Sequence, residues 1–362
     1  MLPAAMKAVW FDEQGGPERI RFGELPTPEP EVDEVLVRVH AIALNGMDPL
    51  VLRGIPALPC PLPMIPCSDG AGEIVRCGRD VDVSRWTVGQ KVSIMPIRAG
   101  MGVLGESLRG LASQYCAIPQ SSLIPLQDSI SYTDAACVPT AYSTAYRLIT
   151  KRLRLCRDER VLILGASGGV GTACVQLALM LGAEVVACAH SEAGLAHLKS
   201  LGAHHCIDIR RADVVGEITR LYGKPSPWGG GGVEVAVNLL GGDSWSRSLA
   251  CLSRGGRLAT CGAGLDPQVT MDLRFVWSFE IDVVGSNGWD VHDQTAILSL
   301  VAEGRLTPRI HDVRPLSAFR EALQDLSEGQ VLGKMVLLPF EAQNSPVARY
   351  RATAVSARSP GR

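Results

Sequence analysis

The run Gly165–Gly171, with the sequence GASGGVG, restricts the fold of this chain more than any other segment. It follows an apolar stretch, Val161–Leu164, and precedes an apolar segment that reaches Leu181, which predicts a strand, a tight turn and a helix. Small residues in such a turn let the backbone approach a pyrophosphate, and the first N–H groups of the helix can bind its oxygens. We therefore expect dinucleotide binding here; the simpler alternative is a structural glycine-rich turn. The candidate contacts are Ala166, Ser167, Gly168, Gly169, Val170 and Gly171.

Further strands and helices alternate on both sides of this loop. A strand over Glu184–Ala189 leads to a helix ending near Leu201, and later strands are expected at Val233–Leu239, Arg257–Cys261 and Ile281–Gly285. Repeated βαβ units imply a parallel sheet covered by helices on both faces. We expect an α/β fold with a doubly wound, Rossmann-type sheet.

The first part of the chain has a different sequence pattern. Short β-branched runs such as Lys7–Phe11, Glu34–His40, Gly72–Arg76 and Gln90–Met95 are separated by Pro and Gly clusters, which predicts a small, mostly β domain. We expect this domain at residues 1–130, the dinucleotide-binding domain at 131–290, a return to the first domain at 291–340, and a disordered tail at 341–362.

Charge and cysteine usage narrow the functional classes. The formal net charge of -2 over 362 residues argues against nucleic acid or an anionic membrane as a partner. The eleven cysteines form no Cys-x-x-Cys pair, and their odd number and wide spacing fit free thiols in a reducing compartment. No signal peptide or membrane span is expected, so the predicted location is cytoplasmic.

The second strand of the βαβ unit bears on the choice of dinucleotide. An NAD-selective site places Asp or Glu at the end of this strand, but here Ala189 is followed by His190 and Ser191. Arg210 and Arg211 follow the expected third strand and could bind a 2′-phosphate. We therefore favour NADPH over NADH, with His190, Ser191 and Arg210 as contacts.

Several ordered motifs together resemble the medium-chain dehydrogenase/reductase superfamily over about residues 6–340, with its alcohol dehydrogenase-like and quinone reductase-like branches closest. They are Glu34–Val39, Asn45-x-x-Asp48 with Arg53-Gly54, Ser68–Glu73, Gly89–Val92, the glycine loop, Leu201–Ala203, Gly255–Arg257 and Gly333-Lys334. The resemblance implies a GroES-like β domain, a Rossmann domain, an active-site cleft between them, and a homodimer. It also implies cofactor contacts at Thr144, Cys261, Gly262, Ala263, Ser286, Asn287 and Gly288, with Lys334 at the pyrophosphate.

The zinc ligands of the related alcohol dehydrogenases are missing from this chain. Their Cys, His-Glu and Cys positions correspond to Asn45, Ser68-Asp69 and Thr140, unless Cys137 serves as the last ligand. Asn, Ser and Thr cannot replace two thiolates and an imidazole. The short stretch Gly100–Gly110 stands where those relatives carry a four-cysteine lobe. We therefore predict no metal.

Without a metal, reduction of a conjugated carbonyl or a quinone is the expected reaction, because the substrate itself accepts the negative charge. The candidate catalytic residues are Asn45, Asp48, Asp69 and Tyr142. Asn45 could orient a carbonyl; Asp69, Tyr142 or a water could supply the proton. A purely structural hydrogen-bond network around Asn45 and Asp48 is an equal alternative. Two other functions stay open: a metal-independent alcohol or carbonyl dehydrogenase, and a cofactor-binding structural or RNA-associated protein without meaningful turnover.

Overall fold

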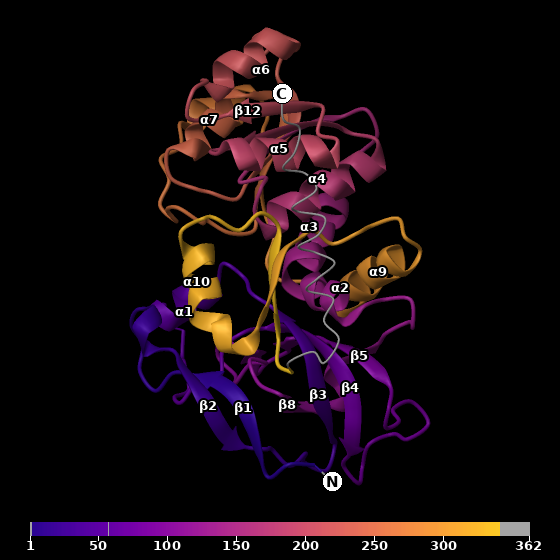
Figure 1. Cartoon of the computed structure of the whole chain (residues 1–362). Coiled ribbons are helices and arrows are strands. Elements are labelled where there is room, and N and C mark those ends of the chain that lie inside the picture. The colour runs from indigo at the N-terminus through magenta and orange to yellow at the C-terminus, as the bar shows by residue number, and fades with distance from the viewer. Residues whose placement is uncertain (1, 57, 341–362) are drawn as a thin grey trace, which may run out of the picture. The chain divides into compact units, whose positions relative to one another are not determined.

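The structure, a computed structural model that describes residues 2–56 and 58–340, divides into two compact units (Figure 1). The first, which we call the β unit, contains the described residues up to Thr140 and again from Gln294 to Phe340. The second, which we call the parallel-sheet unit, is Ala141–Asp293. The expected tail at 341–362 lies outside the described residues.

The parallel-sheet unit is built on one six-stranded sheet with the strand order β12-β11-β10-β13-β14-β15, and all its pairings are parallel. The order reverses beside β10, as in a doubly wound dinucleotide-binding fold, which confirms the expected fold class. Its strands are β10 (Arg160–Leu164), β11 (Glu184–Ala189), β12 (His205–Asp208), β13 (Val233–Asn238), β14 (Leu252–Thr260) and β15 (Asp282–Gly285).

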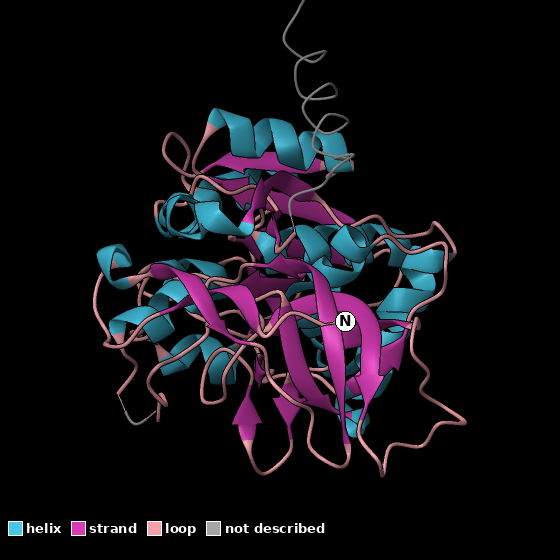
Figure 2. Cartoon of the chain, turned by 60° about the horizontal axis from the view of Figure 1, so that its bottom comes forward, coloured by secondary structure: helices cyan, strands magenta, loops and turns pink. Residues whose placement is uncertain are grey.

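Helices connect these strands, as the cyan and magenta ribbons of Figure 2 show. The predicted strand Glu184–Ala189 coincides with β11. The predicted helix end near Leu201 coincides with the end of α5. Apolar side chains from both sheet and helices, including Leu162, Val186 and Ile218, form the core of this unit. The helices are α3 (Thr144–Tyr146), α4 (Gly169–Leu181), α5 (Glu192–Leu201), α6 (Val214–Tyr222), α7 (Ser244–Ala250) and α8 (Leu273–Ser278).

The β unit contains a seven-stranded sheet in which the order is β16-β17-β3-β4-β5-β9 and β8 pairs with β3. Among the described residues of this sheet, β16 and β17 pair in parallel and the other pairs are antiparallel. The strands of this sheet are β3 (Glu34–Ala43), β4 (Asp69–Cys77), β5 (Lys91–Ile94), β8 (Tyr115–Pro119), β9 (Leu123–Pro125), β16 (Ile310–Pro315) and β17 (Lys334–Leu338).

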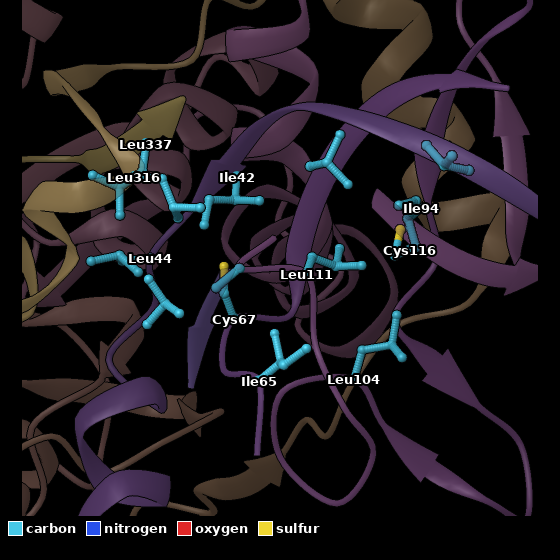
Figure 3. Packing of buried hydrophobic residues seen from close by; sticks show 14 of the residues in the cluster. Ile42, Leu44, Ile65, Cys67, Ile94, Leu104, Leu111, Cys116, Leu316 and Leu337 are labelled. Atoms are coloured by element: carbon cyan, nitrogen blue, oxygen red, sulfur yellow. The ribbon is translucent and has the colours of Figure 1, made fainter. Parts of the chain in front are cut away.

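Two hairpin-like pairs and several helices complete the β unit. Its other elements are β1 (Ala5–Trp10), β2 (Arg21–Pro26), β6 (Ile97–Arg98), β7 (Gly102–Val103), α1 (Asp48–Arg53), α2 (Tyr132–Cys137), α10 (Phe319–Ser327) and the short 3-10 turns Pro17–Arg19, Gln120–Ser122 and Leu316–Ala318. Figure 3 shows its core, where Cys67 lies among the buried side chains of Ile42, Leu44, Ile65 and Leu111. These side chains come from segments far apart in sequence, so burial of the alternating apolar residues holds the sheet and its loops together.

The unit limits differ from the expected 131 and 290. Residues 131–140 stay with the β unit because α2 packs on β3 and β4, and because the backbone and hydroxyl of Thr140 bond to Asp69. At the other limit, Asp293 is fully buried and pairs with Arg147 and Lys151, which keeps it in the parallel-sheet unit. Helix α9 (Val291–Ala302) contains this limit, and Gln294 already bonds to Ser93 of the β unit. The β unit thus resumes at Gln294.

Candidate functional site

The glycine loop has the geometry that the sequence predicts for close backbone packing. Gly165 follows β10 with a φ of +76°, a conformation that L side chains rarely adopt. A Cβ on Gly171 would lie 2.1 Å from the carbonyl oxygen of Gly165, so only glycine allows α4 to approach the strand this closely. A Cβ on Gly168, in contrast, would have no neighbour nearer than 3.8 Å.

The first turn of α4 is open to an anion. Its N-cap is Gly168, which offers no side chain to the free N–H groups of the helix. The buried Thr172 stabilises the loop, because its hydroxyl donates to the carbonyl oxygens of Ala166 and Ser167. The residues present therefore fit the pyrophosphate of a dinucleotide.

The other expected cofactor contacts of this unit also lie beyond the carboxyl ends of parallel strands, where ligands of such sheets bind. His190 and Ser191 follow β11, Cys261–Ala263 follow β14, and Ser286–Gly288 follow β15. The Ser286 hydroxyl is buried and has no hydrogen-bond partner among the described residues, which marks it as a group that a ligand could satisfy. Thr144 is also buried, at the start of α3.

Arg210, an expected contact of the 2′-phosphate, pairs with a neighbouring acid in this structure. Its guanidinium donates to both carboxylate oxygens of Asp208, at 2.9 Å from Nε and 2.7 Å from Nη2. This pair lowers the pKa of Asp208 to about 2. Arg211 is the freer cation, because its side chain is 72% exposed and its contacts with Glu192 and Asp208 are 3.4 Å and 3.8 Å long.

In the β unit, Lys334 is the centre of a buried polar network. Its ammonium donates to the carbonyl oxygen of Leu44 at 2.9 Å, to Asp69 Oδ2 at 3.2 Å and to Asn45 Oδ1. The side chain is only 2% exposed, and these three partners use all three of its N–H donors. In this structure its ammonium bonds within the β unit, and the expected contact of Lys334 with pyrophosphate stays a prediction.

Asp69 is committed to the same network. Besides Lys334, it accepts the Thr140 backbone N–H at 3.1 Å and the Thr140 hydroxyl at 2.6 Å. Thr140 lies in a π-helical turn, Val138–Ser143, that follows α2. The Asp69 carboxylate therefore accepts hydrogen bonds that anchor Lys334 and Thr140.

Asn45 and Asp48 lie between β3 and the first turn of α1, and both side chains are largely buried, with exposures of 8% and 4%. Asp48 Oδ2 accepts the backbone N–H of Asn45 at 2.7 Å. Burial raises the pKa of Asp48 to about 7; the negative charge of Asp69 adds to this, and the Asn45 N–H and Lys334 oppose it. The two residues that the sequence singled out therefore adjoin Lys334 and Asp69.

Glu106 is a further acid whose pKa is influenced by Asp69, and no sequence motif indicated it. Glu106 is half-buried, and desolvation together with the charge of Asp69 raises its pKa. It is brought there by the stretch Gly100–Gly110, in which a Cβ on Gly105 would lie 2.6 Å from the Cys67 backbone. Glycines at 105 and 110 were the only signal in the sequence for this close packing.

The donors near Asn45 and Asp69 do not match the needs of Zn²⁺. Cys67 Sγ lies 3.4 Å from the carbonyl oxygen of Ala43 and 3.5 Å from that of Asp69, and burial raises its pKa well above the ordinary range. Burial likewise raises the pKa of Cys137. Zn²⁺ in alcohol dehydrogenases takes thiolate and imidazole ligands, whereas Asn45 and Thr140 offer an amide and a hydroxyl. Among residues 2–56 and 58–340, no group of three or more His, Cys, Asp or Glu side chains is arranged to hold a metal ion.

Tyr142, the fourth candidate catalytic residue, lies in the parallel-sheet unit. It is fully buried, and its hydroxyl donates to Gln176 Oε1 at 2.9 Å. While that bond is in place, the hydroxyl cannot give its proton to a substrate.

Comparisons with known proteins agree with this architecture. Residues 31–128 match the alcohol dehydrogenase GroES-like domain family, and residues 169–303 match the zinc-binding dehydrogenase family. The human quinone oxidoreductase is 27% identical over 92% of this chain and 98% of its own length. A segment of a phenolphthiocerol/phthiocerol polyketide synthase of Mycobacterium tuberculosis is 33% identical over 90% of this chain, which spans 14% of that protein.

A solved structure of an NAD-dependent alcohol dehydrogenase has a TM-score of 0.85 and 31% identity, covering 92% of this chain and 99% of its own. Within the described part of the chain, no helix has the length and apolar character to cross a membrane. The β unit is thus the GroES-like domain and the parallel-sheet unit the Rossmann domain expected from the sequence. The chain belongs to the medium-chain dehydrogenase/reductase superfamily and is an NAD(P)-dependent oxidoreductase.

Proposed function

We propose that this oxidoreductase works without zinc and reduces the activated C=C bond of a conjugated carbonyl compound, or a quinone. The observation that carries the proposal is the buried ammonium of Lys334, which pairs with Asp69 and bonds to Asn45. A positive charge of the protein itself thus balances the carboxylate at these positions. A second, divalent cation placed beside it would be repelled by Lys334.

The groups that the protein must supply for this reduction depend on where negative charge develops on the substrate. When bound, the nicotinamide supplies a hydride to the β-carbon of the acceptor. The substrate's carbonyl oxygen then takes up the negative charge, so the protein needs hydrogen-bond donors near that oxygen and not a Lewis acid. In the Lys334 network, Asp69 and Lys334 bond to one another, whereas Asn45 Nδ2 and Asp48 Oδ1 are not engaged by them.

We further propose NADPH as the preferred cofactor. In support, β11 ends without an acidic residue, so no carboxylate of that strand would repel a 2′-phosphate. Arg211 supports the preference better than the expected Arg210, because two N–H donors of Arg210 already pair with Asp208. Cofactor contacts at Thr144, Ala166–Gly171, His190 and Ser191, and at the residues that follow β14 and β15, stay predictions.

A homodimer is the assembly we propose. Strand β15 is an edge strand of the six-stranded sheet, so one of its edges has no paired strand among the described residues. Val283 on this strand is 47% exposed. On α8, Leu273 and Trp277 are 63% and 70% exposed. An open strand edge with apolar neighbours favours pairing with a second copy of the same edge. The cytoplasmic location expected from the free cysteines also stays a prediction.

Two other functions compete with this proposal. The likeness to an NAD-dependent alcohol dehydrogenase favours the metal-independent dehydrogenase as second candidate. A structural role with cofactor bound but without turnover has only the sequence resemblance behind it.

The deciding experiment measures NADPH and NADH oxidation by purified protein of known metal content. The acceptors are 1,4-naphthoquinone, 2-cyclohexenone, an enoyl thioester and benzaldehyde, with ethanol and NAD⁺ for the reverse reaction. Turnover of the conjugated acceptors by zinc-free protein supports the proposal. Activity confined to the aldehyde and alcohol, or abolished by removal of stoichiometric zinc, overturns it. Binding of NADPH without turnover of any compound would point to the structural role.

A further inference from the structure

The amide of Asn45 has a fixed orientation. Its Oδ1 accepts a hydrogen bond from the Lys334 ammonium, a group that can only donate. The Nδ2 group must therefore be the other end of the amide. Its sole protein partner among the described residues is the carbonyl oxygen of Ala43, at the long distance of 3.5 Å. Nδ2 thus keeps at least one N–H free for another acceptor.

Asp48 is oriented in a similar way. Its Oδ2 accepts the Asn45 backbone N–H at 2.7 Å, and Oδ1 has no hydrogen-bond partner among the described residues. If the carboxyl group carries a proton, the proton belongs on Oδ1, because Oδ2 is occupied as an acceptor. A protonated Asp48 therefore donates from Oδ1, and Asn45, three residues earlier, donates from Nδ2.

The groups that face Asp48 favour the protonated acid. Asp69 from β4 and Glu106 from the Gly100–Gly110 stretch disfavour a second negative charge, and Lys334 from β17 favours it. Lys334 is already paired with Asp69, and the neighbouring Cys67 is a buried thiol without charge. Desolvation is the largest effect and raises the pKa of Asp48 to about 7.

We propose that Asn45 Nδ2–H and the protonated Asp48 Oδ1–H together form an oxyanion hole for the carbonyl oxygen of the substrate. The inference rests on the proposed reduction of a conjugated carbonyl. Hydride adds to the β-carbon, the C=C pair moves to the α-carbon–carbonyl bond, and the C=O π pair moves onto oxygen. Both donors strengthen their bonds to that oxygen as its charge grows. A solvent proton then adds at the α-carbon to complete the reduction.

The arrangement sets a substrate requirement and a pH requirement. The acceptor must present a carbonyl or quinone oxygen, because only an acceptor atom can use two donors. Activity must fall as pH rises above about 7, because ionised Asp48 cannot donate and would repel the developing oxyanion. A protonated carboxyl group serving as an oxyanion donor has a precedent in ketosteroid isomerase.

The test compares pH profiles of kcat/KM for 2-cyclohexenone and 1,4-naphthoquinone reduction. Wild-type protein should lose about tenfold per pH unit above the pKa of Asp48. Asp48→Asn keeps an acceptor for the Asn45 N–H and a donor that does not titrate, so this variant should retain activity with a flat profile. Asp48→Ala and Asn45→Asp each remove one donor and should lose about 10²–10³-fold in kcat. Asp134→Asn, which changes another partly buried acid of the β unit, is the matched control and should keep the wild-type profile.

Two results would overturn the inference: a fall above neutral pH that persists in Asp48→Asn, or full activity in Asp48→Ala and Asn45→Asp. A second measurement does not depend on turnover. 4-Nitrophenol, whose oxygen resembles an enolate, should bind wild type and Asp48→Asn with NADP⁺ present, and bind Asp48→Ala at least tenfold more weakly; equal binding to all three rules out the oxyanion hole. If only aldehydes are reduced, the proposed function fails, while the same pH profiles on benzaldehyde still decide the role of Asp48.

Discussion

Replacing Asp48 by asparagine should stabilise the β unit at about pH 8 and do much less at about pH 4.5. The folded state raises the pKa of Asp48 from its ordinary value of 3.8 to about 7, mainly by burial. The folded chain therefore holds this proton more tightly than the unfolded chain, so the stability contributed by Asp48 is complete below pH 3.8 and is lost as pH rises to about 7. At about 1.4 kcal/mol per pH unit, the full loss of folding free energy is about 4 kcal/mol. About 3 kcal/mol of this loss occurs between the two assay pH values. Asparagine does not ionise and avoids the loss.

The assay is native-state hydrogen exchange of the β3 and β4 amides, which reports on the β unit separately from the Rossmann domain. The difference in free energy of unfolding between Asp48→Asn and wild type should grow by about 3 kcal/mol from the lower to the higher pH. Asp82→Asn serves as a control of opposite sign, because hydrogen bonds from Ser84 lower the pKa of the exposed Asp82. A stability difference that is the same at both pH values would refute the reasoning, since it would place the effect of the substitution in packing and not in ionisation.

The other predictions concern the cofactor loop, the buried ion pair and the subunit interface. Gly171→Ala should destabilise the Rossmann domain by about 1–3 kcal/mol and weaken NADPH binding, whereas Gly168→Ala should leave its stability unchanged; equal denaturant midpoints for both variants would contradict the clash at Gly171. Lys334→Met should destabilise the β unit by about 3–5 kcal/mol because it leaves Asp69 buried and unpaired, and adding Asp69→Asn should restore most of that loss in urea unfolding. Val283→Asp should shift the protein to a monomer in sedimentation velocity without changing its NADPH affinity, and an unchanged dimer would exclude β15 from the interface.

Local signals predicted the Rossmann domain well. The glycine loop, the apolar strand before it and the Glu184–Ala189 strand each depend on residues that are close in sequence, and the sheet order then follows from right-handed crossovers. Ser191, which begins α5 as its N-cap, is likewise a local signal, since its side chain accepts the Gly194 N–H.

The polar network of the β unit could not be predicted in the same way. Lys334 and Asp69 are 265 positions apart, and nothing near either residue indicates the other. The family position of Lys334 suggested a phosphate contact, whereas its buried carbonyl and carboxylate partners come from the ends of β3 and β4. The partner of Arg210 could not be predicted for a similar reason: a cation after a strand can serve a ligand or a neighbouring acid, and only the folded structure shows that two of its N–H donors bond to Asp208.

The position of Lys334 on β17 also has a consequence for biosynthesis. The ribosome releases Leu44, Asn45 and Asp69 first, then the whole of Ala141–Asp293, and only afterwards the lysine that binds them. During that interval the nascent β unit holds a carboxylate that it cannot bury without a counter-ion. The Rossmann domain, which is continuous in sequence, can complete its own fold in the meantime. We expect the emerging chain to depend on chaperones until β17 arrives, and its first 140 residues expressed alone to be insoluble.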